Sequence, residues 1–159
     1  MRYYWDLIWH FFISNSRHGT HSPFVYELAS RIIYQVSRVS PPLVKAPVDF
    51  NPKYRNLLLE ILDYIRVEEL AYLDASGHED ALLVDICETP AERILEAIGN
   101  GKIIVVDEPF RSRQSKRVWK RLIQSSEVVV SINLFHFGLL MRREGQRKED
   151  FRLRYPFWR

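Results

Sequence analysis

Residues 82–108 hold two apolar runs that end in acids, Leu82-Leu83-Val84-Asp85 and Ile103-Ile104-Val105-Val106-Asp107-Glu108. Unbroken apolar runs are typical of strands buried on both faces, and residues 89–98 between them are long enough for a crossover helix. Upstream, Leu70-Ala71-Tyr72-Leu73-Asp74 repeats the pattern. The three runs predict a parallel α/β sheet, with a ligand site at the carboxyl ends of the strands beside Asp74, Asp85 and Asp107.

Helix, turn and strand signals predict further elements before and after these three runs. Thr89-Pro90-Ala91-Glu92 reads as a capping box that starts the crossover helix, and Gly99-Asn100-Gly101 reads as its end. Ser22-Pro23 and Asn51-Pro52 each predict a helix start, the second helix running to about Arg66. Residues 128–134 and 138–141 predict a hairpin, and residues 151–155 alternate like an edge strand. We expect about five strands, mostly parallel, with a C-terminal antiparallel hairpin.

Length and composition predict one domain. The chain has 159 residues and 47% hydrophobic content, which suits a single core. We expect an N-terminal helical segment and proline-containing connector over residues 1–50, and the α/β core over residues 51–159. A single cysteine, Cys87, excludes an internal disulfide. The beginning of the chain resembles neither a secretion signal nor a membrane span, so we expect a cytoplasmic protein.

An aromatic segment opens the chain. Residues 3–13 include Trp5, Leu7, Ile8, Trp9 and Phe11 and predict a short helix that needs a partner surface. We expect this helix to cap the core. The alternative is a helix that lies on a membrane surface, but such helices usually carry a basic polar face, which this segment lacks.

The basic side chains cluster between residues 111 and 124. The whole chain carries 23 basic and 20 acidic side chains, a balance too even to indicate a nucleic-acid partner by itself. Within the cluster there is no acid, and its members are Arg111, Arg113, Lys116, Arg117, Lys120 and Arg121. Arg113, Lys116, Arg117 and Lys120 are therefore candidates for an anion or nucleic-acid site on a helix spanning residues 111–121. The alternative is a solvated helix face.

Two further blocks resemble a known family. Arg17-His18-Gly19-Thr20-His21-Ser22-Pro23-Phe24-Val25-Tyr26, together with Ser131-Ile132-Asn133-Leu134-Phe135 and Gly138-Leu139-Leu140, is similar to a bacterial branch of the class I S-adenosylmethionine-dependent methyltransferases. That resemblance implies a Rossmann-like sheet whose last hairpin ends in an antiparallel strand. Residues 70–77 look like the family's first strand and cofactor loop, residues 82–85 like its fourth strand, and residues 103–108 like its fifth.

The resemblance also implies that part of the family's sheet is missing. Between Gly77 and Ala81 the helix after the first strand and all of strands two and three are absent, and in the family these hold the adenosine. The loop itself reads Leu73-Asp74-Ala75-Ser76-Gly77-His78, where the family uses a pattern close to Glu-x-Gly-x-x-x-Gly. Asp74 and Gly77 are the residues that carry over as cofactor contacts, and we expect no intact cofactor site.

Catalytic and metal roles carry over to a few acids and one histidine. Asp85, Asp107 and His78 are the candidates for a catalytic base near a substrate. In some related O-methyltransferases, acids at such positions hold a divalent metal, so the resemblance makes Asp85, Asp107 and Glu108 candidate ligands for Mg²⁺ or Ca²⁺.

Three functions follow as hypotheses. The favoured one is a shortened methyltransferase-like protein without catalysis or cofactor, which acts as a binding or regulatory module. Its partner would be a second copy of the chain or a full-length methyltransferase relative, docked at the exposed edge beside the first strand. The alternatives are an active S-adenosylmethionine-dependent O-methyltransferase for a small molecule, and a nucleic-acid-binding module that uses the basic helix.

Overall fold

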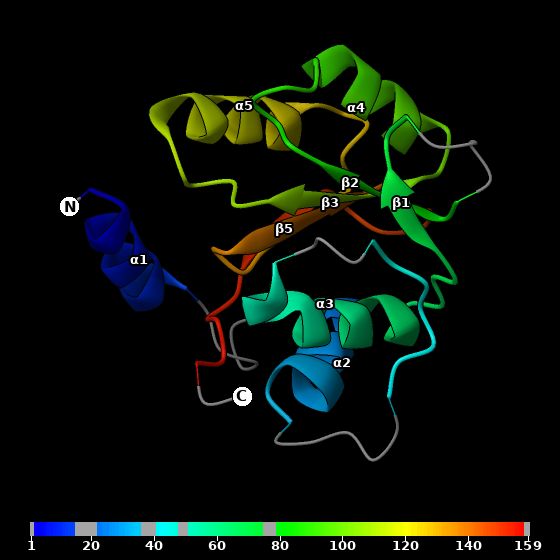
Figure 1. The fold of residues 1–159 in the computed structure, drawn as a ribbon, viewed down its shortest axis with the longest axis horizontal. Coiled ribbons are helices and arrows are strands. Elements are labelled where there is room, and N and C mark those ends of the chain that lie inside the picture. Colours follow the sequence, from blue (N-terminus) through cyan, green and yellow to red (C-terminus); the bar gives the residue numbers. More distant parts are fainter. Residues whose placement is uncertain (1, 15–21, 36–40, 48–50, 75–78, 158–159) are drawn as a thin grey trace.

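A six-stranded mixed sheet forms the centre of the protein (Figure 1). The computed structural model describes residues 2–14, 22–35, 41–47, 51–74 and 79–157. The strand order is β1-β2-β3-β5-β4-β6, and only β5 runs antiparallel to its neighbours. The strands are β1 (Leu70–Tyr72), β2 (Ala81–Val84), β3 (Ile103–Asp107), β4 (Val130–Asn133), β5 (Phe137–Met141) and β6 (Glu149–Arg152). The predicted α/β class, the mostly parallel sheet and the antiparallel hairpin are confirmed.

Helices cover both faces of this sheet (Figure 1). On one face lie α4 (Ala91–Gly99) and α5 (Arg113–Gln124), the crossover helices that follow β2 and β3. On the other face lie α3 (Pro52–Tyr64) and α2 (Pro23–Leu28), the latter continuing as the π-helical η2 (Ala29–Ile33). The first helix, α1 (Arg2–Ile13), lies beside the sheet.

The core has two layers because neighbouring residues of each strand point to opposite faces. Leu83 and Val105 pack in the layer that contains α3, whereas Leu82 and Ile104 pack in the layer that contains α4 and α5. All four side chains are buried. The unbroken apolar runs thus occur because both faces of the central strands are covered.

The connection between β1 and β2 is unusually short for parallel neighbours. Residues 73–80 join the two strands, which pair in parallel with Leu70 opposite Ala81 and Tyr72 opposite Leu83. A parallel crossover normally needs a dozen or more residues, usually including a helix. Because β1 is only three residues long, the return path covers about 10 Å, a distance that the eight residues 73–80 are long enough to cover.

The helix starts were predicted with mixed success. Ser22 and Asn51 are N-caps followed by proline; the Ser22 side chain accepts a hydrogen bond from Val25 N and the Asn51 side chain accepts one from Lys53 N. The capping box proposed at Thr89 is wrong, because α4 begins after Pro90 without any side-chain cap. A capping box lies instead at the start of α5, between Ser112 and Ser115.

The predicted N-terminal helix forms as α1 and packs against the end of the sheet through Tyr3 and His10, whose rings both contact Phe135, but most of its large apolar side chains point away from the core. Trp5 is 70% exposed and Phe12 is 75% exposed, and Tyr4, Ile8 and Trp9 are also exposed. The side of α1 that faces the sheet carries Tyr3, which is half-buried, and His10, which is buried, as is Ser14 directly after the helix. None of the helices in the described ranges is long and apolar enough to cross a membrane.

Two smaller expectations need correction at the C-terminal end. The sheet has six strands rather than about five, because residues 149–152 pair in parallel with β4. This strand begins two residues earlier than the predicted edge strand. Its polar residues Glu149, Asp150 and Arg152 alternate with Phe151, which is buried.

Candidate functional site

The three strand-end acids share the carboxyl edge of the sheet, as predicted from the parallel pairing of β1, β2 and β3. Each of them is held by a different partner. Asp74 accepts a hydrogen bond from Arg93 Nη2 at 2.9 Å and its side chain is 83% exposed. Asp85 forms an ion pair with Arg111 and also accepts a hydrogen bond from Cys87 N at 2.8 Å. The acids therefore lie at the same edge of the sheet, but each one interacts with different residues.

Asp107 ends β3 on the side of the sheet that α3 covers. It accepts a hydrogen bond from the hydroxyl of Tyr54, and this bond together with burial raises the pKa of Tyr54. Glu108 follows with a φ of 39°, a left-handed conformation that non-glycine residues rarely adopt. Burial, and then the neighbouring Asp107, raise the pKa of Glu108.

The other candidates taken from the resemblance are placed only in part. His78 and Gly77 lie outside the described residues, as does the first half of the Arg17–Tyr26 block. Asp85, Asp107 and Glu108 all lie at the carboxyl edge, yet within the described ranges no three His, Cys, Asp or Glu side chains gather in a way that could hold a metal ion. The metal role of these acids stays a prediction.

The basic cluster is partly neutralised by acids from other elements. Lys116 forms an ion pair with Asp6 of α1, and Arg121 Nη2 lies 2.6 Å from Glu92 Oε1 of α4. The remaining cations of the helix, Arg113, Arg117 and Lys120, have no ion pair within the described part of the chain. A nucleic-acid role for this helix stays a prediction, and its free charge is smaller than the sequence suggests.

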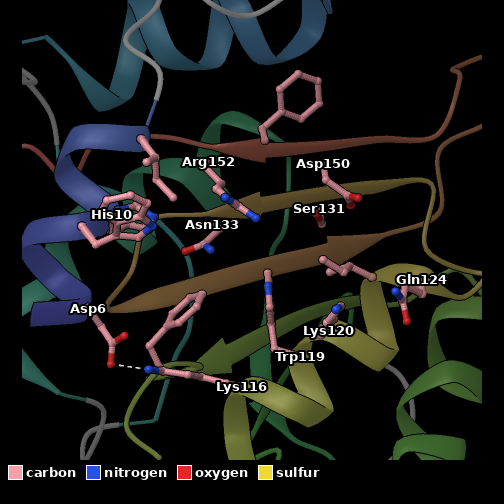
Figure 2. Close-up of a pocket in the computed structure, with 15 residues that line it drawn as sticks. Asp6, His10, Lys116, Trp119, Lys120, Gln124, Ser131, Asn133, Asp150 and Arg152 are labelled. Atoms are coloured by element: carbon pink, nitrogen blue, oxygen red, sulfur yellow. Dashed lines mark hydrogen bonds and ion pairs between the residues drawn. The ribbon is translucent and has the colours of Figure 1, made fainter. Parts of the chain in front are cut away.

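A cavity of about 680 Å³ lies between α1, α5 and the strands β4 and β6. Figure 2 shows His10 on one side, Lys120 and Gln124 of α5 on another, and the β6 side chains Asp150 and Arg152 opposite them. Its volume is within the range of small-molecule sites. Because Asn133 and Arg152 are the last residues of two parallel strands, the cavity reaches the carboxyl edge where ligands of open α/β sheets bind.

The floor of the cavity consists of buried polar groups. Ser131 and Asn133 of β4 are 2% and 3% exposed. Asn133 Oδ1 accepts a hydrogen bond from Phe135 N at 2.9 Å, which holds the tight turn where Phe135 has a φ of 70°. Ser131 Oγ donates to Asp150 Oδ1 at 2.6 Å. These bonds fix the floor in one arrangement before any ligand binds.

His10 closes one side of the cavity. It is 6% exposed, and its Nε2 has no hydrogen-bond partner among the described residues. Burial lowers the pKa of His10 to about 4, and hydrogen bonding to Asn133 offsets only part of that effect. Near neutral pH the imidazole is therefore uncharged, and its Nε2 is a buried polar atom without a described partner.

A second buried histidine adjoins this region at the turn between β4 and β5. The Nδ1 atom of His136 lies 3.2 Å from the Tyr3 hydroxyl, and its ring contacts Tyr155 at a centroid distance of 4.8 Å. Burial, and then the positive charge of Lys53, lower the pKa of His136 to about 4. This group ties α1 to the carboxyl edge of the sheet.

No local sequence pattern points directly to the cavity. Its polar floor and rim residues, Ser131, Asn133, Asp150 and Arg152, alternate with apolar residues along β4 and β6, and the same alternation is typical of a solvent-facing strand surface. Its other wall comes from α1, more than a hundred residues away in the sequence.

Comparisons of the chain with protein-family models, with curated proteins and with solved structures give no match.

Proposed function

We propose that this chain is a methyltransferase-like binding or regulatory module that does not hold S-adenosylmethionine. The observation that carries the proposal is the direct pairing of β1 with β2 across the short connection of residues 73–80. In the family that the sequence resembles, this is where the second and third strands and their adenosine contacts would be inserted. The connection leaves no room for them.

The order of elements supports the resemblance on which the proposal rests. β1, β2 and β3 are parallel neighbours and stand for the family's first, fourth and fifth strands. The hairpin of β4 and β5 follows, and β5 is the antiparallel strand that the family's last hairpin provides. The strand β6 is a departure from that pattern.

The surroundings of Asp74 also support the loss of cofactor binding. In the resemblance Asp74 is the acid of the cofactor loop, but here it is mostly exposed and forms an ion pair with Arg93. A cofactor acid works best where solvent is excluded, because water weakens each polar contact it makes. Asp74 thus occupies a surface position.

The proposed binding role does not specify where a partner docks, but the structure argues against one docking place. The outer edge of β1 was the expected docking place, but Leu70 N already donates a hydrogen bond to Lys45 O at 2.8 Å. The edge of β1 is therefore partly covered by this chain itself, which disfavours strand addition there by a second copy or a full-length relative.

The test is calorimetric titration of the full chain with S-adenosylmethionine and, separately, with S-adenosylhomocysteine. We expect no saturable heat at micromolar concentrations of either compound. A micromolar affinity that Asp74→Asn weakens would overturn the proposal, because it would place a working cofactor site at the end of β1. Circular dichroism of both proteins controls for folding.

A further inference from the structure

We infer that the cavity between α1, α5, β4 and β6 binds a small aromatic molecule that carries one negatively charged group. The inference goes beyond the proposed function and does not depend on the methyltransferase resemblance. It rests on which charges of the cavity are already paired, on the chemistry of its walls and on the buried groups of its floor.

The cavity exists because one region of the sheet has no crossover helix above it. Ser131 and Asn133 of β4 and Asp150 and Arg152 of β6 are polar and line the cavity, whereas Ile132 and Phe151 between them join the core on the opposite face. α5 and α1 stand on two sides of this polar strip (Figure 2). The strip is therefore a recess with walls.

The charges around the recess leave a positive excess. Its lining includes three cations and two carboxylates. Asp6 is paired with Lys116, and Asp150 accepts a hydrogen bond from Ser131. The side chains of Lys120 and Arg152 have no hydrogen bond or ion pair to any described residue. A planar guanidinium opposite an ammonium group suits a single carboxylate or phosphate.

The walls of the cavity favour a ligand in which the anionic group is attached to an aromatic ring. Trp9, Phe110 and Trp119 supply ring surface, and Ile13 and Ile123 supply aliphatic surface. Trp119 is 4% exposed and is held rigidly in the core, whereas Trp9 is 66% exposed and presents more ring surface to a ligand. Flat rings bury large apolar area and stack with favourable geometry on such faces.

The floor adds a polar contact at a defined place. His10 and Asn133 both line the cavity; the Nε2 atom of His10 is buried without a described partner, and the Asn133 side chain is held by its hydrogen bond from Phe135 N. A buried polar atom without a partner is costly, so a ligand hydroxyl or amide that reached it would relieve that cost. The ligand class is thus an aryl carboxylate or aryl phosphate.

The binding test uses calorimetric titration of the full chain with naphthalene-2-carboxylate, 2-naphthyl phosphate and the neutral 2-naphthamide. We expect saturable binding of at least one anion and at least tenfold weaker binding of the amide. The ratio between the carboxylate and the phosphate identifies the anionic group. No binding of either anion, or equal binding of the amide, would overturn the inference.

Variants locate the bound anion. Arg152→Gln should weaken binding at least tenfold and Lys120→Gln several fold, whereas the control Arg117→Gln, on the same helix but outside the cavity, should leave it unchanged. Trp5→Ala with Phe12→Ala tests the exposed face of α1 and should also have no effect. Binding that survives Arg152→Gln but is lost in the α1 variant, or in Arg117→Gln, would place the anion outside the cavity and refute the inference. Circular dichroism confirms that each variant is folded.

Discussion

His10 and His136 are the residues whose burial has the clearest consequence for stability. Both are nearly inaccessible to solvent, and burial lowers the pKa of each from 6.5 to about 4. The charges that act on these rings oppose protonation, since Arg152 acts on His10 and Lys53 on His136, and hydrogen bonding of His10 to Asn133 offsets only part of the effect of burial. Protonation of either ring must therefore oppose folding.

The first prediction concerns acid stability. A lowered pKa means that the unfolded chain binds more protons than the folded chain between pH 6.5 and pH 4. The free energy of unfolding should be maintained above pH 6.5 and should fall as the pH drops through this window, on the order of 3 kcal/mol per histidine. Urea unfolding at a series of pH values measures this slope.

The control for acid stability is the pair of substitutions His10→Gln and His136→Gln, made singly and together. Glutamine does not titrate, so each substitution should flatten the pH slope between 6.5 and 4 even if it lowers stability at neutral pH. A double variant that loses stability as steeply as the parent protein would show that other groups are responsible.

At the scale of elements, the contact between α5 and β5 depends on the absence of a side chain at Gly138. A Cβ at Gly138 would lie 2.4 Å from Cη2 of Trp119, closer than real side-chain contacts allow. Trp119 is buried in the layer of α4 and α5 and is also a wall of the cavity. Gly138 therefore sets how closely the helix approaches the sheet.

The second prediction is that Gly138→Ala destabilises the protein by about 1 to 3 kcal/mol, because the added methyl group forces a rigid indole or the helix to shift. Urea unfolding at neutral pH measures the change. In a Trp119→Leu background the same substitution should cost much less, because the ring that it meets is gone. Equal costs in the two backgrounds would contradict this account of the contact.

The sequence predicted those elements whose signals are local. The strands β2 and β3 follow from unbroken apolar runs, and α2 and α3 follow from a capping side chain before proline. For α1 the sequence predicted the helix but not which side meets the sheet; that side carries Tyr3 and the buried His10. The prediction failed at Thr89, where the capping pattern is present but α4 starts later.

At the scale of the whole molecule, the site was harder to predict than the sheet. The strand-end acids reach one edge as the parallel pattern requires, since pairing of neighbouring parallel strands fixes their position. The cavity instead lies between α1 and strands from the other end of the chain. Which of its charged side chains are free to bind a ligand depends on the ion pairs that they form in the folded protein. Asp6 with Lys116 is such a pair, and sequence spacing cannot reveal it.

The last prediction follows from the two core layers that share one sheet. Leu58 of α3 and Ile94 of α4 are both fully buried, on opposite faces of the same strands. Leu58→Ala and Ile94→Ala should each lower the free energy of unfolding by about 2 to 5 kcal/mol. The control Leu43→Ala, at a side chain that is 87% exposed, should change it little.

Both core variants should still unfold in one transition, because β3 contributes Val105 to one layer and Ile104 to the other. Loss of either layer exposes the same strand, so neither layer can melt while the other stays folded. Far-ultraviolet circular dichroism follows all helices and strands, and tryptophan fluorescence includes the signal of Trp119, the one of the four tryptophans that packs in the layer of α4 and α5 within the described residues. The two measurements should give the same midpoint in urea. Separate midpoints in the Ile94→Ala variant would mean that the layer of α4 and α5 unfolds independently of the layer that contains α3.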